Sequence, residues 1–180
     1  ASRLPVQSIG LCGFEGVPVG SDLIFSVPSI PGFKLFVEIC EDLWAPIPPS
    51  SHAALDGATV MVNLSASNIT VGKDEYRHQL AANQSARCLA AYLYTAAGMG
   101  ESTTDLAWDG HAMVYEDGTL VSESKRFSLE PQVIFGDIDL DRLAKDRVRS
   151  NTFHEARAFG GRAFRQVEVP LKAPAGTVPL

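Results

Sequence analysis

One cysteine, Cys40, stands where a thiol could attack a substrate. The sequence of residues 34–44, KLFVEICEDLW, opens with apolar and β-favouring residues, which predicts a buried strand, and turns acidic at Glu41 and Asp42. A cysteine between a strand and a short helix faces a crevice, together with the backbone N–H groups that follow it. The alternative interpretation is that Cys40 is a small buried apolar residue, as free cysteines often are.

A second set of polar residues follows the next predicted strand. Residues 59–62 (TVMV) are apolar and lead into residues 63–67 (NLSAS), and a long helical pattern begins at Asp74. Two successive strand-to-helix units place Cys40 and Ser67 at one edge of a parallel sheet, where open α/β sheets bind their ligands. Ser67 could instead cap the loop that leads into the helix.

Four segments together resemble the nitrilase-like carbon–nitrogen hydrolases: 37–44 (VEICEDLW), 63–67 (NLSAS), 98–102 (GMGES) and 108–110 (WDG). The most similar branch of that family is the glutaminase domain of glutamine-dependent NAD(+) synthetases. The resemblance extends from about residue 21 to about residue 152.

This resemblance implies an α/β fold, a four-layer α-β-β-α sandwich of which the chain would be the C-terminal part. Residues 1–152 would be a partial carbon–nitrogen hydrolase (glutaminase) domain that lacks its N-terminal part, and residues 153–180 an extended linker or tail. Part of a two-sheet sandwich leaves an apolar sheet face uncovered. We therefore expect the missing part of the domain or a second copy, as in a homo-oligomer, to cover that face.

The resemblance also implies roles for individual residues. Cys40 would attack the side-chain amide of glutamine to give a thioester, and the backbone N–H of Glu41 would bind the oxyanion. The side chains of Glu41, Trp44 and Ser67 match positions that line the glutamine pocket in the NAD(+) synthetase branch. Glu41 would bind the substrate ammonium, although a carboxylate there also complements the helix dipole.

Arg77 is a further candidate for substrate binding. It falls in the arc of the predicted helix that also carries Leu80, Ala81 and Cys88, the face expected to pack on the sheet. Because an unpaired buried charge is unfavourable, Arg77 is expected to meet a carboxylate or the substrate at the Cys40 edge. A snorkelling arginine at the rim of the sheet is the alternative. Cys88 is expected to be a core residue.

The chain offers no evident base for the thiol. In the resembling family a glutamate and an assisting lysine, both well upstream of the cysteine, serve this purpose, and no earlier residue of this chain matches them. Lys34 lies on the same strand at roughly 20 Å from Cys40, given about 3.3 Å per residue. Glu38 shares the strand face of Cys40, and an orienting role is expected for it. These 180 residues alone are thus expected to be inactive.

Three other functions stay open. A Cys–His hydrolase would take its base from His52, His78 or His111, but nothing in the sequence pairs a histidine with an orienting carboxylate. A free-standing nitrilase-like amidase would use the same Cys40 chemistry on other amides. A chain that is only a structural or interaction module would carry no activity.

Composition narrows the class of protein. The net charge is −6, and no apolar run approaches the ~20 residues of a membrane span, so nucleic-acid and membrane partners are not expected. The three cysteines are unpatterned, which is typical of a cytoplasmic protein, and no metal-ligand spacing occurs. No dinucleotide or phosphate-binding fingerprint is present. No cofactor is therefore expected in this chain, and ATP and Mg would belong to a synthetase domain outside it.

Turn residues and hydrophobic periodicity predict the strands and helices that position these residues. Two strands at 6–14 and 22–27 are expected to pair around the turn-rich residues 15–20, ahead of a mostly parallel sheet. The other predictions are a short helix through Leu55 capped by Ser50 or Ser51, a helix from Asp74, a strand at 91–96, a hairpin at Asp117 and Gly118, a strand at 132–138, a helix at 139–149 capped by Asp139, and an extended arm beyond Ser150.

Overall fold

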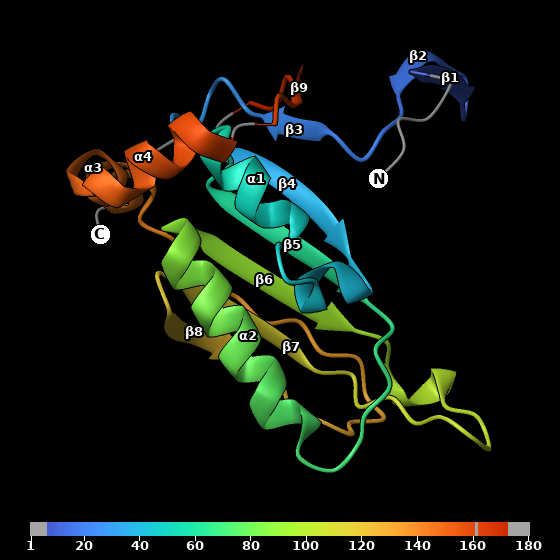
Figure 1. Cartoon of the computed structure of the whole chain (residues 1–180). Helices are drawn as coiled ribbons and strands as arrows, with labels where there is room; N and C mark the ends of the chain where they lie inside the picture. Colours follow the sequence, from blue (N-terminus) through green and yellow to red (C-terminus); the bar gives the residue numbers. More distant parts are fainter. Residues whose placement is uncertain (1–6, 161, 173–180) are drawn as a thin grey trace.

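The computed structural model describes residues 7–160 and 162–172 of the chain (Figure 1). Its strands are β1 (Ser8–Leu11), β2 (Phe14–Pro18), β3 (Leu23–Ser26), β4 (Lys34–Ile39), β5 (Val60–Ser65), β6 (Ala91–Ala96), β7 (Ala112–Glu116), β8 (Thr119–Glu123) and β9 (Arg165–Glu168). Its helices are α1 (Pro49–Leu55), α2 (Lys73–Cys88), α3 (Leu140–Arg149) and α4 (Asn151–Gly160), with 3-10 turns η1 (Cys40–Trp44) and η2 (Met99–Glu101).

Seven strands form one sheet in the order β8-β7-β6-β5-β4-β3-β9, and β1 and β2 form a separate hairpin. Strands β4, β5 and β6 run parallel, because the helical crossovers α1 and α2 join them. The pairs β3–β4, β6–β7 and β7–β8 are antiparallel. The outer pair β3–β9 is parallel. The prediction of a mostly parallel sheet was therefore wrong for β3–β4, β6–β7 and β7–β8, and right for β3–β9 and for the three strands that position the candidate site.

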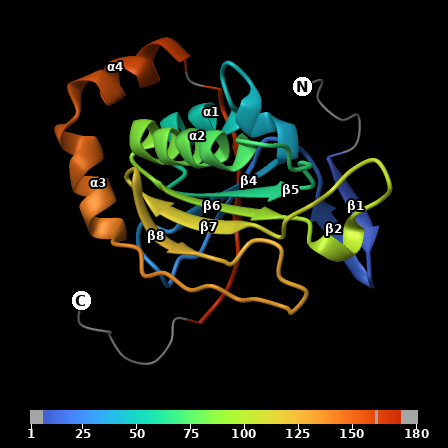
Figure 2. The same cartoon turned by 90° about the horizontal axis from the view of Figure 1, so that it is seen from below.

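Helices α1 and α2 cover one face of the sheet (Figure 2). Alternate residues of the central strands point into this layer and form the core with Ala53, Ala54 and Ala81; they are Phe36, Met61, Tyr92 and Met113, each at most 2% exposed. On the opposite face Ile39 and Leu64 are 56% and 48% exposed. The predicted uncovered apolar sheet face is thus present at the carboxyl ends of β4 and β5.

The segment 132–138 was predicted to be a strand, and this was wrong. It has no regular structure and crosses the open face of the sheet next to Val60, Leu93 and Val114. The reason is that this backbone lies directly on the side chains of β7 and β8. The approach is so close that a Cβ added at Gly136 would be only 2.8 Å from Val121 Cγ1. A segment on the face of a sheet has no strand edge to pair with.

The first hairpin and the first helix cap also differ from prediction. The hairpin turns at Cys12 and Gly13, both with positive φ, rather than at 15–20, and β3 pairs with β4 and β9 instead of with the first strand. Pro48 and Pro49 begin α1 without a side-chain cap. The hydroxyl of Ser50 accepts a 2.9 Å hydrogen bond from Gln84 Nε2 instead.

Residues beyond Ser150 were expected to form an extended arm, but they pack on the domain. They form α4 and then β9, which pairs in parallel with β3 at the sheet edge. Phe164 is 9% exposed and lies edge-on to Phe36, with ring centroids 5.4 Å apart. Contacts with residues that are distant in the sequence thus outweighed the weak local sequence pattern. Residues 173–180 of the expected tail lie outside the described residues.

The other predicted elements are confirmed. β6 covers residues 91–96 as expected, and the β7–β8 hairpin turns at Asp117 and Gly118, both with positive φ. Asp139 caps α3 by accepting a 2.9 Å hydrogen bond from the Arg142 N–H. Among residues 7–160 and 162–172, no helix has the length and apolar character that crossing a membrane requires.

Candidate functional site

Cys40 lies at the corner between β4 and η1, as predicted. Its φ of 48° is in the left-handed region, which costs a non-glycine residue about 1–2 kcal/mol. Two side chains hold the corner: Asp42 accepts a 2.8 Å hydrogen bond from the Ile39 N–H, and the Asn63 amide donates to the Cys40 carbonyl oxygen at 3.3 Å. Cys40 itself is half-buried, whereas Cys88 is in the core.

An open cavity of about 410 Å³ lies beside Cys40, at the carboxyl ends of the three parallel strands. Its lining comes from Ile39, Cys40, Leu64, Ser65, Ala66, Thr95, Ala96 and Ala97. Parallel strands direct their carboxyl ends to one edge, which is where α/β sheets bind ligands. The first N–H groups of η1, including that of Glu41, have no acceptor within that turn.

The other predicted pocket residues do not line this cavity: Glu41 and Trp44 belong to η1, which begins at Cys40, and Ser67 follows β5. Trp44 is half-buried, with its ring centroid 5.3 Å from that of Tyr76, and Glu41 is exposed. Ser67 is 8% exposed in the loop after β5. Gly72 precedes α2, and no side chain caps this helix.

Lys73 also belongs to this corner, although it was not predicted from the sequence. Its ammonium lies 5.2 Å from the centroid of the Trp44 ring and donates to the carbonyl and side-chain oxygens of Asn68, at 2.6 and 3.2 Å. Burial and the charge of Arg77 lower the pKa of Lys73, while Cys40 and Asp109 act in the opposite direction. The sequence feature that could have identified Lys73 is its position at the first residue of α2. A cation there opposes the helix dipole, so it needs another reason to be present.

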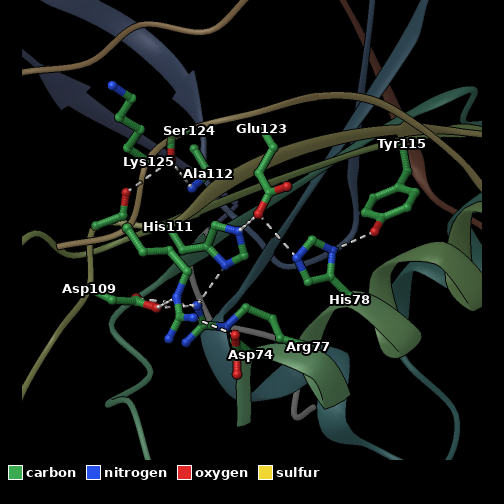
Figure 3. Close-up of polar contacts among 12 residues, drawn as sticks. Asp74, Arg77, His78, Asp109, His111, Ala112, Tyr115, Glu123, Ser124 and Lys125 are labelled. Atoms are coloured by element: carbon green, nitrogen blue, oxygen red, sulfur yellow. Dashed lines mark hydrogen bonds and ion pairs between the residues drawn. The ribbon is translucent and has the colours of Figure 1, made fainter. Parts of the chain in front are cut away.

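Arg77 meets a carboxylate, and the rim alternative was wrong. Its side chain is fully buried and stacks on the Tyr94 ring at 5.2 Å. Nη1 donates to both oxygens of Asp109, at 3.2 and 3.0 Å (Figure 3). Arg126 Nε also donates to Asp109, at 2.9 Å. Burial opposes ionisation of Asp109, but the two arginines outweigh it and lower the pKa of that carboxyl. Helix α2 is thereby tied to the loop before β7.

His111 is locked in one neutral tautomer by the same arginine. Arg77 Nη1 lies 3.0 Å from His111 Nδ1, and a guanidinium only donates, so Nδ1 must be the acceptor and Nε2 must carry the proton. Nε2 then donates to Glu123 at 2.8 Å (Figure 3). Burial lowers the pKa of His111; the Glu123 contact opposes that shift and Arg77 adds to it.

This arrangement argues against a metal centre and against His78 or His111 as the base of a Cys–His pair. His78, His111 and Glu123 place ligand atoms within 4.8 Å of one another, but a metal would need an unprotonated His111 Nε2. His78 contacts Tyr115 and Glu123 through its two ring nitrogens, at 2.6 and 3.2 Å. Neither ring has a free nitrogen for the Cys40 thiol. The carboxylate that pairs these histidines, Glu123, is on β8 and could not be assigned from sequence spacing.

Glu38 is not placed as a base either. It is 2% exposed, and its two oxygens accept from the Tyr92 hydroxyl and, at 3.0 Å, from the Ser50 N–H. Burial raises the pKa of Glu38, and these two donors oppose the shift. The expected orienting role is the one that this geometry supports.

Comparison with known proteins identifies the family of the chain. The family model described as "Carbon-nitrogen hydrolase" matches residues 6–148. The glutamine-dependent NAD(+) synthetase of Mycobacterium tuberculosis H37Rv is 49% identical over 171 residues, which are 93% of this chain and 25% of that protein. The Saccharomyces cerevisiae enzyme of the same name is 29% identical over 94% of this chain and 23% of its own length. The chain thus spans about a quarter of the length of the curated relatives it matches.

Solved structures are similar in fold. A glutamine-dependent NAD(+) synthetase from Cytophaga hutchinsonii has a TM-score of 0.57 at 24% identity, over 72% of this chain and 20% of that one. A carbon-nitrogen hydrolase from Helicobacter pylori has a TM-score of 0.56 at 16% identity, over 77% and 53% of the two chains. With the family model matching most of its length and a cysteine at the expected strand end, this chain belongs to the carbon–nitrogen hydrolase family.

Proposed function

We propose that the chain is the glutaminase part of a glutamine-dependent NAD(+) synthetase. The observation that carries the proposal is Cys40, which has a left-handed backbone conformation directly after β4 and lies beside an open cavity. It occurs in a chain 49% identical to the enzyme of that name from M. tuberculosis. In this function glutamine is hydrolysed to glutamate, and the ammonia amidates deamido-NAD in a synthetase domain outside these residues. ATP and Mg belong to that domain, and this chain needs no cofactor.

In the proposed reaction the Cys40 sulfur attacks the side-chain amide carbon of glutamine. A base takes the thiol proton during the attack and gives it to the leaving ammonia, while the Glu41 N–H donates to the oxyanion. Water then hydrolyses the thioester to glutamate and the free thiol. The base and an oxyanion-binding lysine come from outside the described residues, since both oxygens of Glu38 already have donors.

The substrate's two charged groups each need a partner at this corner. We assign the α-ammonium to Glu41 and the α-carboxylate to Lys73, whose ammonium lies over Trp44. Trp44 forms an aromatic wall and Ser67 a polar contact. Arg77, which is fully buried and bound to Asp109, positions the loop before β7. The open sheet face around Ile39 and Leu64 packs against the rest of the sandwich or a second copy of the chain.

The test compares two nitrogen donors in the complete gene product. Cys40→Ala should abolish NAD(+) formation from glutamine and leave NAD(+) formation from ammonia within about twofold of wild type, since only the ammonia supply is removed. The measurement is NAD(+) formed from deamido-NAD and ATP with each donor. Equal activity of Cys40→Ala and wild type on glutamine would exclude Cys40 as the nucleophile. Amide hydrolysis without any NAD(+) synthesis would instead support a free-standing amidase, and neither activity a structural module.

A further inference from the structure

We propose that a buried polar cluster beneath the corner, made of Glu38, Asn63 and Tyr92, is a positioning device for the nucleophile. The cluster fixes the left-handed backbone of Cys40 through the hydrogen bond from the Asn63 amide to the Cys40 carbonyl oxygen, 3.3 Å long. This inference rests on the proposed role of Cys40 and adds the residues that hold it in place.

The sheet register brings these three side chains together. Glu38 on β4 lies directly opposite Asn63 on β5, and Met61, two residues before Asn63, lies opposite Tyr92 on β6. Side chains two residues apart share a face, so all three point to the helix-covered side. They are 2%, 0% and 0% exposed for Glu38, Asn63 and Tyr92.

The cluster is centred on the Glu38 carboxylate, which is anchored from two elements. The Tyr92 hydroxyl donates to one of its oxygens from β6, and the Ser50 N–H in the first turn of α1 donates to the other at 3.0 Å. The Glu38 carboxylate and the Cys40 carbonyl are both hydrogen-bond acceptors. Both therefore favour the orientation of the Asn63 side chain in which its NH₂ group, rather than its oxygen, faces them. In this orientation Asn63 Nδ2 reaches Cys40, and Asn63 Oδ1 has no partner among the described residues.

The need for such a device follows from the strain at Cys40. A non-glycine residue with φ of 48° keeps that conformation only where its surroundings over-determine it. Asp42 holds the N-terminal side of the corner through the Ile39 N–H, and Asn63 holds the carbonyl side. Loss of the Asn63 donor allows the Cys40 peptide to relax, which moves the sulfur and the following N–H together.

The experiment measures steady-state glutaminase kinetics of the complete gene product with Asn63→Ala and Tyr92→Phe. A nucleophile displaced by about 1 Å loses on the order of 100-fold in rate. We expect kcat to fall by about that factor in Asn63→Ala and about tenfold in Tyr92→Phe, with KM for glutamine within about threefold of wild type. The rate of Cys40 alkylation by iodoacetamide should fall in the same order.

The matched control is Tyr94→Phe. Tyr94 is a buried tyrosine on the same strand and face as Tyr92, but its hydroxyl has no hydrogen-bond partner in the described part of the chain. It should keep kcat within about twofold, since only the ring is needed for packing. If Asn63→Ala does not fold, Tyr92→Phe decides the question by itself. An unchanged kcat in Tyr92→Phe, or a rise in KM without a fall in kcat, overturns the proposal. A wild-type protein that releases no ammonia from glutamine overturns the proposed function instead.

Discussion

At the scale of single residues, the chemistry of this chain depends on how three cysteines differ. Cys40 is half-buried at a cavity, Cys12 is exposed in a hairpin turn, and Cys88 is in the core. Burial raises the pKa of Cys88 to about 11, so it is almost entirely protonated at neutral pH.

The three thiols should therefore respond differently to limited alkylation. Cys88 should react slowest, and glutamine should protect Cys40 alone, because only Cys40 faces the proposed substrate cavity. Mass spectrometry of iodoacetamide-treated protein, with and without glutamine, measures the labelling of each cysteine. Cys12 is the internal control for general accessibility. Glutamine protection of Cys12 or Cys88 with none at Cys40 would contradict the site.

Lys73 provides a prediction about substrate specificity. Lys73→Gln in the complete gene product should lower kcat/KM for glutamine by about 10- to 100-fold, the effect of one lost charged hydrogen bond. The same variant should act normally on 4-aminobutanamide, which has the ammonium and the amide but no α-carboxylate. Kinetics with both amides measure the difference. An equal loss on both would mean that Lys73 only secures the Asn68 loop.

At the scale of elements, buried charges join α2 to the loop before β7. Asp109 is fully buried and accepts from Arg77 and Arg126, and Arg126 also contacts Asp74. Replacing one partner of a buried pair leaves the other charge without compensation.

Asp109→Asn should therefore lower the free energy of unfolding by about 3–5 kcal/mol. The control is Arg142→Gln, which removes a half-exposed arginine 3.7 Å from Glu116 and should change stability by less than about 1 kcal/mol. Urea unfolding of both variants beside wild type measures the two values. Similar small losses in both variants would show that the Arg77–Asp109 pair is not a structural requirement.

At the scale of the whole molecule, the buried His111 makes stability depend on pH. Its pKa is lowered in the folded protein, chiefly by burial, while an unfolded histidine titrates near 6.5. Between those two pKa values the unfolded state binds more protons than the folded state. The free energy of unfolding therefore keeps the whole contribution of His111 above about pH 6.5 and loses it as the pH falls toward the folded pKa.

A variant that cannot titrate should remove this dependence. His111→Gln can still accept from Arg77 and donate to Glu123 through its amide, so the fall in Tm between pH 7.5 and 5.5 should be smaller than in wild type. The control is His154→Gln, because His154 is exposed on α4 and should leave the wild-type slope unchanged. Differential scanning calorimetry at the two pH values measures it. If Tm of His111→Gln falls with pH as steeply as Tm of wild type, His111 is not the group that makes stability depend on pH.

The sequence by itself determined the features that depend on neighbouring residues. The strand-to-turn corner at Cys40, the β6 strand and the Asp117–Gly118 hairpin follow from local period and turn chemistry, and the structure confirms each of them. The nucleophile candidate could thus be named from residues 34–44 alone. The family, too, follows from short contiguous motifs.

Tertiary structure decided what depends on contacts between distant residues. The Arg77–Asp109 pair, the tautomer of His111, the position of Lys73 over Trp44 and the Asn63 hydrogen bond to Cys40 join residues 23 to 34 positions apart. β9 pairs with β3 although its own sequence is a weak strand. No local pattern encodes which of several polar residues will share a buried space, because that depends on sheet register and helix packing, which are set by the whole chain.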